Sequence, residues 1–227
     1  MHAWPYGDPA KAPARAPLHV GGSLDAATLL AAYRHGVFPW YSPGEPVEWW
    51  SPDPRFVLPT GELRVSASLR KTMRKPGWLV TIDQDFEGVM RRCAETPRPG
   101  QDGTWISEEM IAAYVALHRQ GFAHSVEVRW EGALVGGLYG VAIGRIFHGE
   151  SMFHHRTDAS KVGFVALVER LHASGFPLID CQMPTKHLAS FGAGMARRTD
   201  FLALLAWERD RTPAADAWVS PLSLSGA

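Results

Sequence analysis

The spacing of apolar residues along the chain predicts a series of alternating strands and helices. An amphipathic helix begins after Ser107, has an apolar face that includes Ile111 and Tyr114, and ends at Gly121. Ser23, Ser68 and Asp85 are expected to cap earlier helices. The predicted strands are 63–66, 78–83, 124–130, 133–143, 145–149 and 178–182, and the predicted helices are 23–36, 68–75, 85–95, 107–121, 160–174, 185–191 and 200–209.

The order of these elements predicts an α/β fold, with an α+β mixed sheet flanked by helices. This order resembles that of the acetyltransferase superfamily named for the GCN5 histone acetylases, in which two neighbouring strands splay apart and admit the substrate. The resemblance implies a GCN5-related N-acetyltransferase-like catalytic domain over residues 61–227. Residues 1–60 are expected to form a small N-terminal domain that contributes a Trp-rich loop.

The N-terminal part of the chain is rich in proline and tryptophan. Residues 38–59 contain six prolines together with Trp40, Trp49 and Trp50. Because proline lacks a backbone donor, we expect neither a regular helix nor a central strand in this segment. Its aromatic side chains must therefore pack or bind a ligand. Residues 1–17, with prolines at 5, 9, 13 and 17, are expected to form a loose arm.

Composition narrows the classes of protein to consider. Hydrophobic residues make up 46% of the 227 residues, enough for a substantial core, and 23 basic residues balance 23 acidic ones. Bulk charge thus does not indicate a nucleic-acid partner, and such a site must come from local clustering. Two cysteines without a CxxC pair, no apolar run of membrane length and no apolar leader indicate a soluble cytoplasmic protein without a membrane partner.

A cluster of basic residues lies on the predicted helix 68–75. Arg70 and Arg74, like Lys71 and Lys75, are four residues apart, so they form one positive face. No acidic residue occurs between positions 64 and 82 to offset them. Short charge runs are usually solvated faces, whereas in a neutral protein such a concentration also fits a phosphate-binding surface, and the sequence leaves both interpretations open.

Three polar residues lie where two neighbouring strands are expected to converge. Asp180 and Gln182 are two apart on a predicted strand, so their side chains should share a face, and Glu150 should approach from the next strand. Carboxylates beside apolar strands must be hydrogen-bonded or face a cleft. Without further context two satisfied structural acids would be the default, but two acids with an amide at one cleft favour a functional site.

Other motifs are weaker than they first look. Residues 149–153 lack the second glycine of a nucleophile elbow. His148, His154 and His155 have no partner motif for a metal, so surface histidines are expected and no metal is predicted. Residues 154–161 occupy the place of the glycine-rich loop that binds the pyrophosphate of acyl-CoA in acetyltransferases, yet they contain no glycine.

Several segments in a fixed order together resemble the leucyl/phenylalanyl-tRNA–protein transferases. No single segment is specific, but the set covers most of residues 20–200. The segments are Phe38–Gly44, Trp49–Arg55, Gly103–Ile106, His124–Glu127, Leu134–Val141, Gly149–Phe153 and Leu178–Gln182.

The resemblance implies a reaction and its partners. The donor is leucyl-, phenylalanyl- or, less well, methionyl-tRNA, and the acceptor is a protein with an N-terminal Arg or Lys, which is thereby marked for degradation. No cofactor is implied. The basic helix, with Arg70, Lys71, Arg74 and Lys75, matches the region that grips the acceptor stem.

The resemblance also implies roles for single residues. Trp40 and Trp105 match aromatics that hold the terminal adenosine of the tRNA. The pocket for the amino-acid side chain matches Leu138, Phe147 and Met152, of which Leu138 departs from the methionine frequent in relatives. The catalytic group matches Glu150, Asp180 and Gln182.

Chemical reasoning assigns an expected role to each member of that group. An aminoacyl ester is already activated, so alignment with an amine and removal of a proton suffice. Gln182 should orient the amine through its carbonyl oxygen, Asp180 should polarise and hold Gln182, and Glu150 should attract the cationic acceptor. Water or a tRNA hydroxyl is left as the final proton acceptor. Two alternatives remain, namely an acyl-CoA-dependent N-acyltransferase of the same fold and a non-catalytic RNA-binding module.

Overall fold

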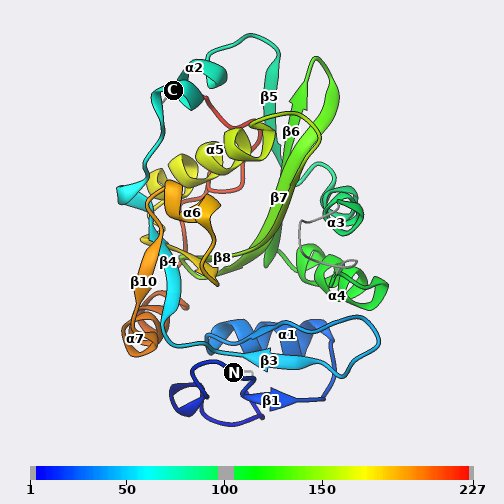
Figure 1. Ribbon diagram of the computed structural model, residues 1–227, viewed down its shortest axis with the longest axis vertical. Coiled ribbons are helices and arrows are strands. Elements are labelled where there is room, and N and C mark those ends of the chain that lie inside the picture. The colour runs from blue at the N-terminus through cyan, green and yellow to red at the C-terminus, as the bar shows by residue number, and fades with distance from the viewer. Residues whose placement is uncertain (1–3, 97–104, 225–227) are drawn as a thin grey trace.

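A computed structural model describes residues 4–96 and 105–224 of the chain. Its centre is a seven-stranded mixed sheet with the strand order β10-β4-β9-β8-β7-β6-β5, and helices cover both of its faces (Figure 1). A smaller three-stranded sheet, of order β1-β3-β2, lies below it in Figure 1 with helix α1. The predicted α/β fold with a mixed sheet is confirmed.

An antiparallel meander forms one half of the large sheet. It consists of β5 (Trp78–Ile82), β6 (Ala123–Trp130), β7 (Ala133–Ile143) and β8 (Ile146–His154). The prediction located these strands but ended the last one at residue 149, five residues too early. A register shift between Tyr139 and Gly140 lets β8 pair with β7 beyond its own Gly149. Because of this continuation, Glu150 and Met152 lie on the strand.

A helical crossover joins the meander to the other half of the sheet. Helix α5 (Ala159–Ala173) connects β8 to the parallel strand β9 (Leu178–Gln182), as parallel neighbours require. The two strands pair only from Ile146 and Leu178 up to His148 and Asp180. Beyond that point β8 and β9 no longer pair, so Glu150 and Gln182 follow the place where the strands separate.

The first strand of the large sheet was not found from sequence. No strand forms at residues 63–66; instead β4 (Arg55–Pro59) lies between β9 and β10 (Gly194–Ala196), inside the segment where proline was expected to exclude a central strand. The expectation was wrong because Pro54 precedes the strand and Pro59 ends it, so neither removes an internal donor.

The helices α2, α3 and α4 follow the predicted order with one shifted start. Helix α2 (Ala67–Met73) begins after Ser66, whose Oγ accepts the Leu69 N–H, and not after Ser68. Asp85 and Ser107 cap α3 (Phe86–Glu95) and α4 (Glu108–Arg119) as predicted. The short helix α6 (Lys186–Ser190) and the longer α7 (Arg198–Glu208) follow β9, and 3-10 turns occur at Pro9–Lys11 and Thr60–Glu62.

The N-terminal part of the chain is packed around one tryptophan. Strands β1 (His19–Val20), β2 (Phe38–Pro39) and β3 (Glu48–Trp50) adjoin α1 (Ala26–Arg34), which Asp25 caps in place of the predicted Ser23. The fully buried Trp49 is contacted edge-on by Trp4, and Tyr6 lies beside it. Within residues 4–17 the expected loose arm is therefore a packed segment, because two of its aromatics cover the sheet.

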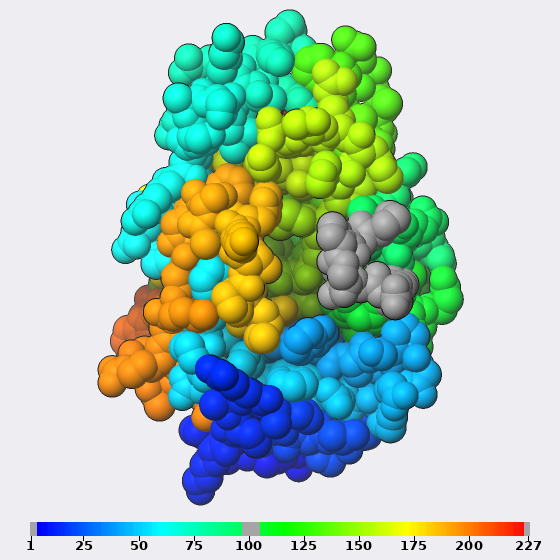
Figure 2. Space-filling view, in the orientation of Figure 1, coloured from blue at the N-terminus to red at the C-terminus, as the bar shows by residue number. Residues whose placement is uncertain are grey.

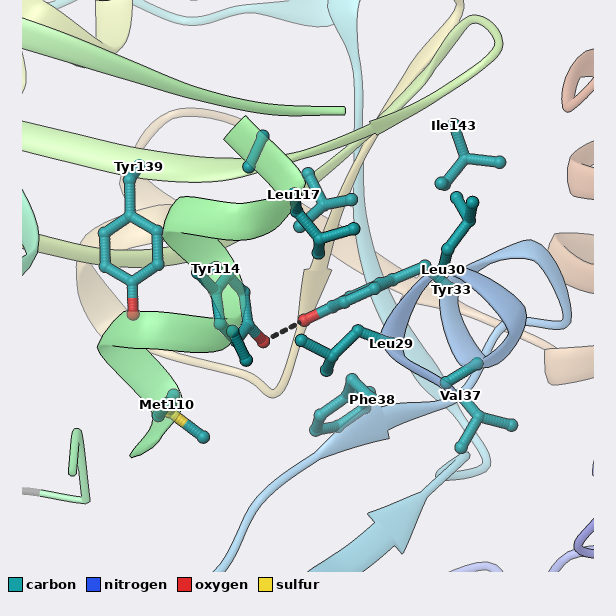
Figure 3. Packing of buried hydrophobic residues seen from close by; sticks show 14 of the residues in the cluster. Leu29, Leu30, Tyr33, Val37, Phe38, Met110, Tyr114, Leu117, Tyr139 and Ile143 are labelled. Atoms are coloured by element: carbon teal, nitrogen blue, oxygen red, sulfur yellow. Dashed lines mark hydrogen bonds between the residues drawn. The ribbon is translucent and has the colours of Figure 1, made fainter. Parts of the chain in front are cut away.

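The large sheet separates the hydrophobic core into two layers. On one face α1, α3 and α4 pack together, and Figure 3 shows Leu29, Leu30 and Tyr33 of α1 meeting Tyr114 and Leu117 of α4. On the other face α2, α5 and the C-terminal segment pack, with Trp218 stacked on His124. Within the described ranges, no helix combines the length and apolar character needed to cross a membrane.

A substitution at Gly140 tests how closely β7 and β8 must pack beneath the site. A Cβ at this position would lie 2.2 Å from the His148 carbonyl oxygen and 2.5 Å from the Phe147 ring. Gly140→Ala should lower the free energy of unfolding by about 1–3 kcal/mol, as overpacking does. Gly194→Ala is the matched control, because no atom lies within 4 Å of its added Cβ. Urea unfolding of both variants measures the difference, and equal stabilities would contradict the close approach.

Candidate active site

A cavity of about 400 Å³ opens where β8 and β9 separate. In the space-filling view a hollow lies in the middle of the molecule, beside the orange segment that includes α6 (Figure 2). The cavity walls come from the β2 region, the strands β7, β8 and β9, helix α5 and the α6 region. The predicted residues among its lining are Trp40, Trp105, Leu138, Phe147, Glu150, Met152 and Gln182.

The apolar part of the cavity unites the three residues predicted for the side-chain pocket. Leu138 and Phe147 are buried, and Met152 is half-buried beside them. Phe164, Ile179 and Leu188 also line the cavity and were not predicted for it. Phe164 is a buried residue of α5, and the spacing of apolar residues along a helix does not distinguish a cavity wall from a core.

Two loop tryptophans border the same cavity. Trp40 is 37% exposed, and Trp105 is half-buried. The Trp40 ring lies edge-to-face against Trp50 at 5.3 Å, and the Trp50 indole N–H donates to the Trp40 carbonyl oxygen at 2.9 Å. The position of Trp40 is thus fixed while part of its ring stays accessible. Gly103 and Thr104, part of the matching segment before Trp105, lie outside the described residues.

Glu150 is held by three donors at the polar end of the cavity. The Tyr33 hydroxyl donates to Oε1 at 2.7 Å, the Gln182 amide Nε2 to Oε1 at 2.6 Å, and the Tyr114 hydroxyl to Oε2 at 3.3 Å. The two tyrosine hydroxyls also contact each other, as the dashed line in Figure 3 shows. Because each hydroxyl carries one proton, Tyr114 donates either to Tyr33 or to Glu150 at any one time.

Burial governs the protonation of Glu150. Desolvation raises its pKa to about 7, the hydrogen bonds from Tyr33 and Gln182 oppose the rise, and the negative charge of Asp180 adds to it. A carboxyl group with a pKa near neutrality can exchange a proton under ordinary conditions. The expectation that Glu150 attracts a cation stays a prediction, and a pKa near 7 also allows this carboxyl group to accept a proton.

Asp180 has the opposite character, although it is also fully buried. Arg55 donates from Nε to Oδ1 at 2.8 Å and from Nη2 to Oδ2 at 2.6 Å, and His148 Nδ1 lies 2.7 Å from Oδ2. Burial alone would raise the pKa of Asp180, but the charge and the hydrogen bonds of Arg55 hold it well below its usual range. Asp180 is therefore a permanent anion that anchors its neighbours.

The expected contact between Asp180 and the Gln182 side chain does not form. Asp180 Oδ1 accepts the backbone N–H of Gln182 at 3.0 Å, while the side-chain amide of Gln182 donates to Glu150. The reason is the backbone of Gln182, whose φ of 62° is left-handed, so the alternation of an extended strand ends there. Gln182 lines the cavity, and among the described residues none donates a hydrogen bond to the oxygen of its side-chain amide.

His148 was expected at the surface and is instead fully buried. It pairs with Asp180 in the β8–β9 register, so its ring is enclosed by the sheet and by Tyr33. His154 and His155 are exposed, as predicted. Within residues 4–96 and 105–224, no group of three His, Cys, Asp or Glu side chains is arranged to hold a metal ion.

Three important residues were missed from sequence. Arg55 comes from β4, Tyr33 from α1 and Tyr114 from α4, and each reaches the site over more than 30 residues of sequence. Tyr114 had been assigned to an apolar helix face, which correctly indicates burial but says nothing about its hydroxyl. The one available signal for Arg55 was its place in the segment Trp49–Arg55.

The predicted basic residues lie on α2 and in the turn that follows. Lys71, Arg74 and Lys75 are exposed, and Arg70 is half-buried. Burial raises the pKa of Glu169 on α5, and the neighbouring Arg70 guanidinium opposes this rise. Arg70 is therefore partly engaged with α5, while the other three present their charge at the surface.

Comparison with known proteins identifies the family of the chain. A family model described as "Leucyl/phenylalanyl-tRNA protein transferase" matches residues 57–206, and one for the N-terminal domain of the same proteins matches residues 22–53. The chain belongs to the leucyl/phenylalanyl-tRNA–protein transferase family. It is thus an enzyme of the aminoacyltransferase class.

Relatives with the name leucyl/phenylalanyl-tRNA–protein transferase resemble this family member over most of its length. The protein of Pseudomonas entomophila is 57% identical over 202 residues, which are 89% of this chain and 88% of the relative. That of Stutzerimonas stutzeri is 60% identical over 199 residues, 88% of each chain.

Solved structures overlap the transferase only in part. A GCN5-related N-acetyltransferase from Kribbella flavida matches 74% of this chain and 59% of its own, with 13% identity and a TM-score of 0.36. L-PGS from Bacillus licheniformis matches 60% and 48%, with 12% identity and a TM-score of 0.41.

The buried Arg55–Asp180 pair should control the stability of the transferase. Arg55→Met or Asp180→Asn leaves one buried group without its partner, so each should lower the free energy of unfolding by about 3–5 kcal/mol. The double variant should lose less than the sum of the two. Thermal and urea unfolding of the two single variants and the double variant measure these changes in stability. Arg197→Ala, which removes an exposed ion pair with Asp200, is the control and should change nothing measurable; additive losses in the double variant would show that the pair is not coupled.

Proposed function

We propose that this enzyme transfers leucine or phenylalanine, and methionine less well, from aminoacyl-tRNA to the N-terminal Arg or Lys of acceptor proteins. The transfer would take place in the cytoplasm and mark the acceptor for degradation. One observation carries the proposal, namely that a single cavity is apolar on one side, bordered by two tryptophans, and polar at Glu150 and Gln182. The family and the names of its members support the same reaction.

The aminoacyl end of the tRNA fits this division of the cavity. Trp40 and Trp105 offer ring surface to the terminal adenine, a contact worth about 1–3 kcal/mol for a stacked base. Leu138, Phe147 and Met152 receive the side chain of the amino acid. An apolar pocket discriminates by roughly 1–3 kcal/mol per methylene, so related apolar side chains are accepted with graded efficiency.

The polar end supplies the proton chemistry. Gln182 receives an N–H of the acceptor amine on its free carbonyl oxygen, and Glu150 accepts the proton that the α-ammonium group must lose. The amine nitrogen then forms a bond to the ester carbonyl carbon, the bond to the ribose oxygen breaks, and the second amine proton ends on that oxygen. Asp180 is a positioning residue, because it touches Gln182 only through the backbone.

Charge near the tRNA is supplied by α2 and the turn after it. Lys71, Arg74 and Lys75 lie exposed on a protein whose net charge is zero, and Arg70 begins the same face. Phosphate contacts of this kind hold a nucleic acid without reading its sequence. The basic residues are accordingly proposed to contact the acceptor stem and the 3′ strand that continues from it.

A transfer assay tests the proposed reaction against two alternatives. Radiolabelled leucyl-tRNA and a peptide that begins with Arg should give labelled peptide, whereas the same peptide with an acetylated N-terminus should give none because it has no free amine. Valyl-tRNA is the donor control and should react poorly. Transfer of an acyl group from acyl-CoA would support an N-acyltransferase instead. Binding of tRNA with no transfer to any peptide would support an RNA-binding module.

The pH dependence of kcat/KM tests the role of Glu150. Its carboxylate form is present above a pH of about 7, so kcat/KM should fall as the pH decreases through that value. The α-ammonium group of the acceptor, with a pKa of about 7.7–8.0, contributes to the same decrease. Tyr33→Phe separates the two, because it removes a hydrogen bond that lowers the pKa of Glu150 and leaves the acceptor unchanged. The acidic limb should therefore move to higher pH in this variant.

Two further variants complete that experiment. Glu150→Gln should lower kcat by roughly 100-fold or more, as expected when a general base is removed. A raised KM with normal kcat would instead support simple attraction of the acceptor. His187, whose pKa is lowered by burial, also lines the cavity, so His187→Ala serves as the control and should keep the wild-type pH profile.

A further inference from the structure

A second cavity lies outside the active site, between the end of α2 and the segment that leads into α5. It has a volume of about 290 Å³. Its lining is mostly polar and consists of Thr72, Lys75, Trp78, Arg156, Thr157 and Asp158. Two cations, two hydroxyl groups and one carboxylate thus surround this space. Lys75 was predicted to contact the tRNA, whereas Arg156 had no predicted role.

Arg156 is fixed in this cavity by two tryptophans. Its guanidinium carbon lies 4.1 Å from the ring centroid of Trp130 and 5.8 Å from that of Trp78. The tryptophans themselves meet edge-to-face at 4.7 Å, and the Trp78 indole N–H donates to the Thr72 carbonyl oxygen at 2.9 Å. Stacking uses the face of the guanidinium and leaves the N–H groups at its edge free for an anion.

The charge in this cavity is not balanced from within the described part of the chain. The carboxylate of Asp158 is bound by Lys161 Nζ at 2.7 Å. Among the described residues, neither Lys75 nor Arg156 forms an ion pair. A planar guanidinium beside an ammonium group is the arrangement that recognises a phosphate, the guanidinium by its paired donors and the lysine as a point charge.

The position of Arg156 connects this cavity to the active site. Met152, in the wall of the active-site cavity, and Arg156 are four residues apart, so the intervening chain spans at most about 14 Å. In Figure 2 the blue-green segment with α2 and the yellow-green segment that leads into α5 lie above the central hollow. A phosphate bound at Arg156 therefore lies close to an aminoacyl group bound in the active-site cavity.

We propose that Lys75 and Arg156 bind a backbone phosphate of the single-stranded 3′ end of the donor tRNA. This site rests on the proposed function, since it serves the same donor, and it extends the contact surface beyond the predicted basic helix. The stacked Arg156 orders the last few nucleotides, and the terminal adenosine then enters the active-site cavity between Trp40 and Trp105.

The phosphate site can be tested by comparing leucyl-tRNA with leucyl-adenosine, a donor that has no phosphate. Arg156→Ala and Lys75→Ala should each raise KM for leucyl-tRNA roughly tenfold, the effect of one charged hydrogen bond, and should reduce the salt dependence of tRNA binding by about 0.7 per lost phosphate contact. The same variants should use leucyl-adenosine, which has no phosphate, with wild-type kinetics. Arg156→Lys should be intermediate because it keeps the charge without the planar stack.

The controls separate this proposal from its alternatives. Arg119→Ala removes one exposed arginine of α4, outside the cavity, and should leave KM for leucyl-tRNA unchanged. Equal losses with leucyl-adenosine, together with a lower melting temperature, would mean that Arg156 only packs against the tryptophans and would overturn the proposal. Inhibition by inorganic phosphate that disappears in Arg156→Ala without any change in KM for tRNA would assign the cavity to a free anion instead.

The wild-type enzyme distinguishes failure of this site from failure of the proposed function. If it transfers leucine from both donors and the cavity variants behave as wild type with tRNA, the phosphate site is wrong and the reaction stands. If it transfers leucine from neither donor, the proposed function itself is wrong.

Discussion

The ion pair between Arg55 and Asp180 is the interaction on which the active site depends. Both side chains are fully buried, and the guanidinium is enclosed by the rings of Phe38 and Phe201 at 4.7 Å each. A third donation, from Arg55 Nη1 to the Gly36 carbonyl oxygen, reaches the turn after α1. One cation therefore links the N-terminal layer, β4, β9 and α7, and its loss would leave a buried charge uncompensated.

The same ion pair gives two neighbouring carboxyl groups, those of Asp180 and Glu150, different pKa values. Asp180 receives the strong donors and stays ionised, whereas Glu150 receives only neutral donors and keeps a pKa near 7. Two carboxyl groups with environments that push their pKa values apart can serve different purposes, one as an anchor and one as a proton acceptor. Gln182 connects them, because Asp180 fixes its backbone and Glu150 receives its side chain.

The sequence was most informative where structure is local. Apolar spacing and caps located β7 and β9 to the residue, and α3 and α4 within a few residues, because periodicity and capping act over short stretches. It failed for β4, whose partners lie more than a hundred residues away, and for Arg55, which meets Asp180 only in three dimensions. The left-handed backbone of Gln182 could not be predicted either, because the strand pattern implied an extended backbone with the Gln182 side chain beside Asp180.

The position of β4 in the sheet has a consequence for how the enzyme is made. This strand ends at residue 59, whereas its two neighbours begin at residues 178 and 194. During synthesis both of its edges therefore stay without their partner strands until residues 178–196 have left the ribosome, and contacts of such long sequence separation form slowly. The charge of Arg55 remains unpaired with Asp180 for the same period. The active site, which needs Arg55 beside Asp180, therefore cannot be completed before β9 has emerged.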